Sequence, residues 1–181
     1  REPESFDILK SRVLPELMDR KKGNEDLRVW VPGCSTGEEV YSLAVLFREL
    51  AEERGERPEV QLFASDIDPT AIEKARAGLY PSSIEADVTP ARLERYFVRE
   101  DNRYRVCREI RDMVVFSVQD VLKDPPFIHL DLISCKNLLI YLNSEAQKNL
   151  IPLLHYSLNQ KGLLMLGTSE SIGRYTDIFE T

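Results

Sequence analysis

The stretch VWVPGCSTGEEVYSLAVLF, Val29 to Phe47, is the feature that most constrains the fold of this chain. An apolar run typical of a buried strand leads into a short turn bounded by Gly33 and Gly37, and a helical pattern follows directly. Because glycine has no Cβ, such a turn lets backbone approach a ligand closely. Glu38 and Glu39 open the helix, where carboxylates suit the dipole but repel a phosphate. The stretch therefore predicts a strand, turn and helix that hold a nucleoside-like ligand without phosphates.

Strand and helix patterns alternate along most of the chain. Buried strands are expected at 27–33, 59–68, 129–135 and 161–170. Helices are expected at 6–18 with a bend at Pro15, and at 38–54, 69–77, 90–96 and 144–158. Repeated βα units predict an α/β fold with a mostly parallel sheet and flanking helices. Alternating apolar residues in RYRVCREIRDMVVFSV predict a small antiparallel β-subdomain inserted at about 95–118.

The composition is that of one globular domain and narrows the range of partners. With 181 residues, 43% of them hydrophobic, the chain can bury a substantial core. A net charge of -7 opposes binding to nucleic acid or to an anionic membrane. No apolar run approaches the roughly 20 residues of a membrane helix, and no signal peptide is visible. The three cysteines form no CxxC pair, which fits a reducing cytoplasm, and no metal site is expected.

Polar residues follow the predicted strands, at the sheet edge where open parallel sheets bind ligands. Asp66 ends the second strand, where an acid can accept hydrogen bonds from both ribose hydroxyls. Asp120 ends the strand MVVFSVQDVL and is placed to accept from an adenine amino group. Lys136 and Asn137 follow the strand at 129–135, with Tyr141 one helical turn further on. Because no GxGxxG motif is present, the pattern favours S-adenosylmethionine over a pyrophosphate-bearing cofactor.

Several residues near these positions have a simpler structural interpretation. Asp68 precedes Pro69 and Thr70 and is expected to cap a helix rather than to bind ligand. Cys34 and Cys135 are expected to be small buried residues, not nucleophiles, and the two histidines to be structural. The segment DPPF, 124–127, resembles a tetrapeptide of DNA amino-methyltransferases. Its position before a strand and the acidic charge of the chain favour a loop instead.

Four segments resemble the chemotaxis receptor methyltransferase family, CheR, and most of all the CheR modules of CheB/CheR-type multidomain fusions. They are GCSTGEEVYSLA, FASDIDPTAIEKARAGLY, CKNLLIYLN and GLLMLGTSESIG. The resemblance covers nearly the whole chain in order. It implies a Rossmann-like, S-adenosylmethionine-dependent methyltransferase domain over 1–181. The implied reaction moves a methyl group to a glutamate side chain of a chemoreceptor, which gives a methyl ester and S-adenosylhomocysteine.

The resemblance also implies roles for particular residues. Cofactor contacts are expected from Gly33, Gly37, Glu39, Asp66, Asp120, Val121, Lys136 and Asn137. Arg1, Lys136 and Tyr141 are the expected catalytic residues, since Arg1 matches the last position of the family motif TxFFR. On this reading the N-terminal helical domain and the last strands of the family's sheet are missing from the sequence. Lys136 stands where the family has arginine, so a point charge replaces a two-pronged donor.

The implied biology is that of a cytoplasmic signalling enzyme. Its partner would be the cytoplasmic domain of a methyl-accepting chemoreceptor, with other signalling domains fused to the chain, and with no nucleic acid and no membrane insertion. Two alternatives remain open on the sequence. One is a module that binds S-adenosylmethionine without catalysis, which is favoured by Lys136 in place of arginine and by Asp120, which stands where many family members have asparagine. The other is a methyltransferase that acts on a small molecule.

Overall fold

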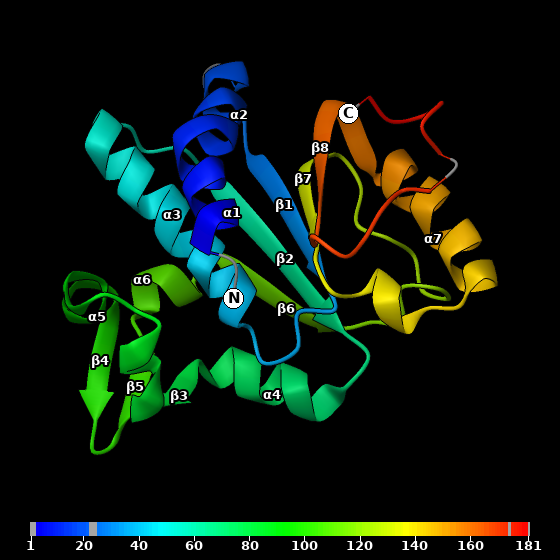
Figure 1. Cartoon of the computed structure of the whole chain (residues 1–181). Helices are drawn as coiled ribbons and strands as arrows, with labels where there is room; N and C mark the ends of the chain where they lie inside the picture. The colour runs from blue at the N-terminus through cyan, green and yellow to red at the C-terminus, as the bar shows by residue number, and fades with distance from the viewer. Residues whose placement is uncertain (1–2, 22–24, 174, 181) are drawn as a thin grey trace.

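A computed structural model shows an open, fully parallel five-stranded sheet (Figure 1). It describes residues 3–21, 25–173 and 175–180. The strand order is β6-β2-β1-β7-β8, so the chain starts in the middle of the sheet and builds outward in both directions. The five strands are β1 (Leu27–Pro32), β2 (Val60–Asp66), β6 (Val114–Val118), β7 (Leu130–Cys135) and β8 (Leu158–Leu166). The predicted α/β class with a mostly parallel sheet is therefore confirmed.

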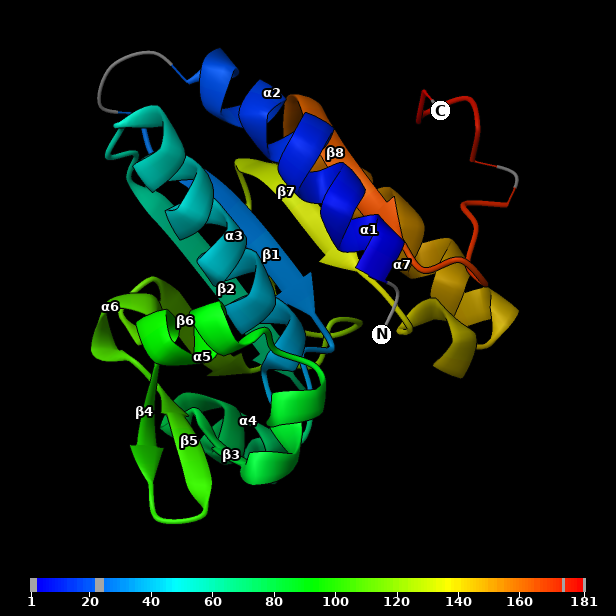
Figure 2. The same ribbon diagram turned by 60° about the vertical axis from the view of Figure 1, so that its left-hand side comes forward.

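Helices cover both faces of this sheet, as the two views show (Figures 1 and 2). One face carries α1 (Pro3–Ile8), α2 (Leu14–Arg20) and α3 (Glu38–Arg54), and the opposite face carries α7 (Ser144–Ser157). Shorter helices are α4 (Pro69–Ala77), α5 (Pro90–Tyr96) and α6 (Arg108–Arg111), and 3₁₀ turns span Ser82–Ala86 and Leu139–Tyr141. Among the residues described, none of the helices combines the length and apolar character that a membrane crossing requires.

The alternation of side chains along each strand separates two hydrophobic cores. In β1, Val29 and Val31 pack with the residues of α2 and α3, whereas Trp30 between them packs with α7. The Trp30 indole donates a hydrogen bond to Ser65 Oγ at 2.9 Å, which satisfies its one polar atom inside the core. Phe127 of the DPPF segment covers the same face, with its ring 4.6 Å from that of Phe63. The prediction that this segment is a loop is confirmed.

The N-terminal helical run differs from the single bent helix that the sequence predicts. A π-helical turn, Leu9–Val13, separates α1 from α2. Pro15 lies in the first turn of α2, where a missing backbone N–H is tolerated. The predicted cap at Asp68 is confirmed, because its side chain accepts from Thr70 N at 2.8 Å, and at the start of α7 Asn143 accepts from Ala146 N at 2.9 Å. Capping residues therefore predict where a helix begins, but they do not predict the π-helical turn inside the N-terminal helical segment.

A second sheet has three antiparallel strands in the order β3-β5-β4. Its strands are β3 (Leu79–Pro81), β4 (Phe97–Glu100) and β5 (Arg103–Val106). The observed strands differ from the expected range of 95–118 at both ends. Strand β3 joins from upstream, and β6 pairs in parallel with β2 of the main sheet after α6 interrupts the alternation. Alternation predicts that a segment is a strand, but it carries no information about the strand's partner.

Candidate functional site

The glycine turn lies at the carboxyl end of β1, as predicted. Gly33 and Gly37 both have left-handed backbone, with φ of +66° and +90°. A Cβ at Gly37 would lie 3.0 Å from Ala75 Cβ, and one at Gly33 would lie 3.1 Å from Leu138 Cδ1. Since both positions need positive φ and close contacts, glycine is required by the turn itself.

Asp66 holds this turn against the end of the neighbouring strand β2. Its Oδ2 accepts a hydrogen bond from Ser35 N at 2.8 Å, and its Oδ1 accepts from Asp68 N at 3.0 Å. An ionised carboxylate offers about four acceptor sites, so each oxygen keeps capacity for a further donor. Asp66 is half-buried at the edge of the sheet, where such a donor could reach it.

Glu39 joins the first turn of α3 to strand β7. Its side chain is half-buried, and Ser134 Oγ donates a hydrogen bond to Glu39 Oε1. Glu38, in contrast, is exposed and accepts from Thr36 Oγ1 at 2.7 Å. The two neighbouring acids therefore face different surroundings, and Glu39 is the one that points toward the sheet edge.

The end of β6 contains one residue that the sequence analysis missed. The Asp120 carboxylate is already engaged: Oδ1 accepts from Leu122 N at 3.0 Å, and Oδ2 lies 3.3 Å from Lys123 Nζ. Gln119 beside it is 6% exposed, donates to Pro125 O at 2.8 Å, and has an Oε1 that is buried without a partner among the described residues. Its backbone N–H donates to the backbone oxygen of Asp66, so Gln119 lies next to Asp66 at the ends of two neighbouring strands. Val121 packs on the core beneath.

Lys136, Asn137 and Tyr141 follow β7 but have very different surroundings. Lys136 is only 9% exposed, and its ammonium lies 5.0 Å from the centre of the Phe6 ring. Asn137 has left-handed backbone with φ of +58°. Tyr141 is 80% exposed, so it is not a core residue. Helix α1 therefore contributes Phe6 to the surroundings of Lys136, and no local sequence pattern links two positions so far apart.

The remaining predictions concern Arg1, two cysteines and the absence of a metal site. Arg1 lies outside the described residues. Cys34 and Cys135 are free and buried, and burial raises the pKa of each thiol to about 12, so neither is an activated nucleophile. Within the described part of the chain, His, Cys, Asp and Glu side chains form no group of three or more able to hold a metal ion.

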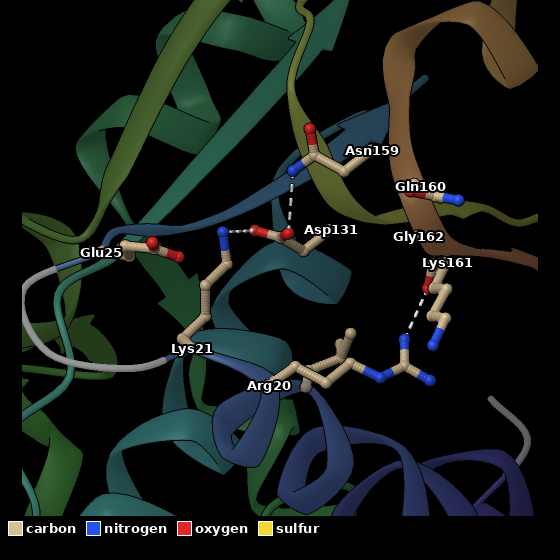
Figure 3. Close-up of a pocket in the computed structure, with 9 residues that line it drawn as sticks. Arg20, Lys21, Glu25, Asp131, Asn159, Gln160, Lys161 and Gly162 are labelled. Carbon is tan, nitrogen blue, oxygen red and sulfur yellow. Dashed lines mark hydrogen bonds and ion pairs between the residues drawn. The ribbon is translucent and has the colours of Figure 1, made fainter.

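A cavity of about 200 Å³ lies at the opposite, amino edge of the sheet (Figure 3). Its central acid is Asp131, which is 8% exposed. Asp131 accepts from Arg28 N and from Asn159 Nδ2, both at 2.9 Å, and pairs with Lys21 Nζ at 3.1 Å. These partners tie β1, β8 and the end of α2 to β7. We interpret the cavity as a structural cluster, because its acid is neutralised within the chain.

The parallel sheet with flanking helices is a fold found in S-adenosylmethionine-dependent methyltransferases. The chain superposes on the apo structure of the S-adenosylmethionine-dependent methyltransferase SibL with a TM-score of 0.53 and 14% identity, over 90% of this chain and 35% of that one. Residues 1–181 match the family described as "CheR methyltransferase, SAM binding domain". The chain therefore belongs to the CheR family, and the resemblance found in the sequence is confirmed.

Two relatives contain a matching region within a longer chain. An "Uncharacterized 104.1 kDa protein in hypE 3'region" of Rhodobacter capsulatus is 40% identical over 179 residues, which are 99% of this chain and 19% of that protein. "Chemotaxis protein methyltransferase 1" of Pseudomonas aeruginosa is 32% identical over 185 residues, 99% of this chain and 67% of that protein. The chain thus spans about one fifth of the first relative and about two thirds of the second.

Proposed function

We propose that this protein transfers a methyl group from S-adenosylmethionine to a glutamate side chain of a chemoreceptor, in the cytoplasm. Membership of the CheR family and the name of the Pseudomonas aeruginosa relative support the reaction and the substrate. The observation that carries the proposal is Asp66: its Oδ2 holds the glycine turn at Ser35 N, its Oδ1 accepts from Asp68 N, and both oxygens retain acceptor capacity for the two ribose hydroxyls.

The other residues of the edge fit the rest of the cofactor. A buried acceptor without a partner is costly, and the amino group of an adenine would satisfy Gln119 Oε1. Val121 would then contact the adenine ring, while Gly33, Gly37 and Glu39 would face the methionine and sulfonium portion. Negative charge at this edge suits a sulfonium and repels a phosphate. The predicted contact from Asp120 is less favoured than one from Gln119, because the Asp120 carboxylate is engaged by Leu122 N and Lys123.

The proposed reaction requires no general acid or base from the protein. S-adenosylmethionine supplies an electrophilic methyl group on a positively charged sulfur. A glutamate acceptor has an ordinary pKa near 4.3, so it is already a carboxylate at neutral pH and needs no general base. The residues of the site must instead align the carboxylate oxygen, the methyl carbon and the sulfur. Such alignment of two reactants is worth roughly 7–11 kcal/mol in favourable cases.

Three residues are proposed to handle the acceptor. The buried Lys136 ammonium places positive charge close to the end of β7 and offsets repulsion between the incoming carboxylate and the acids of the site. The exposed Tyr141 hydroxyl can orient the acceptor from outside. Arg1 is proposed to bind the acceptor carboxylate in two bonds, which lysine cannot do.

The cofactor site is tested by calorimetric titration of S-adenosylhomocysteine. Asp66→Ala should weaken binding by at least about 100-fold, since it removes two charge-assisted hydrogen bonds. Asp68→Ala is the matched control two residues away. It removes only a helix cap, so we expect a loss of about 1 kcal/mol in the free energy of unfolding and unchanged affinity. Equal affinity of the wild type and Asp66→Ala would contradict the proposed site.

The acceptor is tested with membranes that contain chemoreceptors. Labelled S-adenosylmethionine should yield base-labile methyl groups on the receptor, as expected for a glutamate methyl ester. Cofactor binding without transfer to any receptor would instead indicate a non-catalytic module. Transfer that does not require receptor would indicate a small-molecule substrate.

A further inference from the structure

Glu170 accepts three backbone hydrogen bonds from two segments at the carboxyl edge. Its Oε2 accepts from Asn137 N and from Gly167 N, both at 2.8 Å, and its Oε1 accepts from Leu139 N at 2.7 Å. The turn that carries it is closed by Glu170 N donating to Gly167 O at 3.0 Å. One half-buried carboxylate therefore connects the loop after β7 to the end of β8.

The loop that Glu170 holds is the one that carries the site residues after β7. Lys136 precedes the first N–H donor directly, and Asn137 itself adopts the left-handed backbone. Leu138 lies between the two donors, and its side chain packs beside the glycine turn, with Cδ1 3.1 Å from where a Cβ at Gly33 would lie. Tyr141 N donates to Leu138 O at 3.1 Å, so the turn that presents Tyr141 starts from the same held segment.

We propose that Glu170 is a positioning residue for the cofactor site: its carboxylate fixes segment 136–141, and through Leu138 also the glycine turn. This inference rests on the proposed function, because it assigns a purpose to Glu170 only if the edge binds S-adenosylmethionine. Glu170 is not a catalytic residue in this proposal, since it acts through the backbone of the loop. Within the described residues it has no cation at ion-pair distance, so backbone N–H groups are its observed partners.

A carboxylate is the side chain that this arrangement requires. Glutamine has the same length, but its NH₂ group cannot accept a hydrogen bond. In Glu170→Gln at least one of the three N–H groups therefore loses its acceptor. Gly167 constrains the same carboxylate from the other side, because a Cβ there would lie 2.8 Å from Glu170 Oε2 and 3.3 Å from Asn137 Oδ1. Gly167→Ala should disturb the arrangement while keeping the charge.

The test compares Glu170→Gln with Asp131→Asn in the same protein. Asp131 is also a carboxylate that joins strands, but it lies at the opposite edge of the sheet (Figure 3). Urea unfolding gives the stability of each variant, and calorimetry with S-adenosylhomocysteine gives its affinity. We expect affinity to fall at least about tenfold in Glu170→Gln and to stay unchanged in Asp131→Asn, although both lose stability. In methyl transfer, KM for S-adenosylmethionine should rise only in Glu170→Gln.

Each other result has a defined meaning. If Glu170→Gln binds as tightly as the wild type, Glu170 is not a positioning residue. If both variants lose affinity in proportion to their stability, the effect is global and the inference is also wrong. If Glu170→Gln does not fold, Gly167→Ala replaces it with the same expected selective loss. A wild type that binds no S-adenosylhomocysteine would overturn the proposed function itself, and this inference with it.

Discussion

The two edges of the parallel sheet use carboxylates in opposite ways. At the amino edge, Asp131 is paired with Lys21 and with two N–H donors, so its charge is neutralised within the chain. At the carboxyl edge, Asp66 and Glu170 accept from backbone N–H groups, and in the described part of the chain neither is paired with a cation. The first arrangement stabilises the fold alone. The second also keeps negative charge at the surface where a positively charged ligand can use it.

Helix α3 runs between the two edges and is flanked by a glycine with left-handed backbone at each end. Substituting these two glycines should give the largest difference between the edges. Gly37, at the carboxyl edge, is crowded: a Cβ would lie 3.0 Å from Ala75 Cβ and 3.2 Å from the Tyr80 hydroxyl. Gly55, at the other end, has nothing within 4 Å of such a Cβ. Gly37→Ala should lower the free energy of unfolding by about 3 kcal/mol, and Gly55→Ala by about 1 kcal/mol.

The same two variants should differ more in their affinity for S-adenosylhomocysteine than in their free energy of unfolding. S-adenosylhomocysteine affinity should be lost in Gly37→Ala, because its turn cannot keep the conformation that faces the ligand. It should be unchanged in Gly55→Ala. Calorimetry on both variants, below the temperature at which either unfolds, measures this. Unchanged affinity in Gly37→Ala would show that the turn is only a connection between strand and helix.

Alkaline pH should destabilise the carboxyl edge through its buried thiols. Burial raises the pKa of Cys34 and of Cys135 from 9.0 to about 12, so both stay protonated in the folded state when the unfolded chain has lost these protons. The folded state then binds more protons, and stability is full below pH 9 and falls as pH rises toward 12. The slope should approach about 1.36 kcal/mol per pH unit for each thiol.

Urea unfolding at a series of pH values from 8 to 11 checks this slope. The double variant Cys34→Ala and Cys135→Ala should show a flatter dependence between pH 9 and 10. A residual slope should remain above pH 10, because burial also raises the pKa of Tyr41 to about 12. The same slope in the double variant and the wild type would mean that other groups control the alkaline transition.

Much of this architecture could be predicted because its signals are local. The helix over 38–54 and the cap at Asp68 rest on periodicity and on neighbouring residues, and both are confirmed. The glycine turn and Asp66 were found because strand ends of a parallel sheet meet at one edge. The structure brings them into direct contact through Ser35 N.

What could not be predicted depends on partners that are distant in sequence. Glu170 appeared only inside a family motif, because its donors at Asn137 and Leu139 lie about thirty positions earlier. The sequence indicates Asp120 rather than Gln119 as the adenine contact. The burial of Gln119 Oε1 and its lack of a partner among the described residues are visible only in the folded chain. The strand at Val114–Val118 was assigned to the hairpin pattern because alternation does not identify a strand's partner.

Two lysines, one at each edge of the sheet, allow a test with the smallest expected effect, a change in methyl transfer at one edge only. Lys136→Met removes a buried charge but keeps most of the side-chain volume, and because this lysine has partners within the chain, the free energy of unfolding should fall by about 1–3 kcal/mol. Lys21→Met should cost a similar amount, because it leaves the buried Asp131 without its cation while both N–H donors stay. Methyl transfer should fall by at least about tenfold in Lys136→Met and remain unchanged in Lys21→Met, since of these two lysines Lys136 is the one proposed to bring positive charge to the acceptor.

The family residue at the same position sharpens this test. Lys136→Arg restores a guanidinium that can bind a carboxylate through two hydrogen bonds, where lysine offers a point charge. Its kcat/KM for the receptor should equal or exceed that of the wild type if the charge at this position acts on the acceptor. A loss of transfer in Lys136→Arg as large as in Lys136→Met would contradict that role. The packing of the lysine against Phe6, rather than its charge, would then be what the site requires.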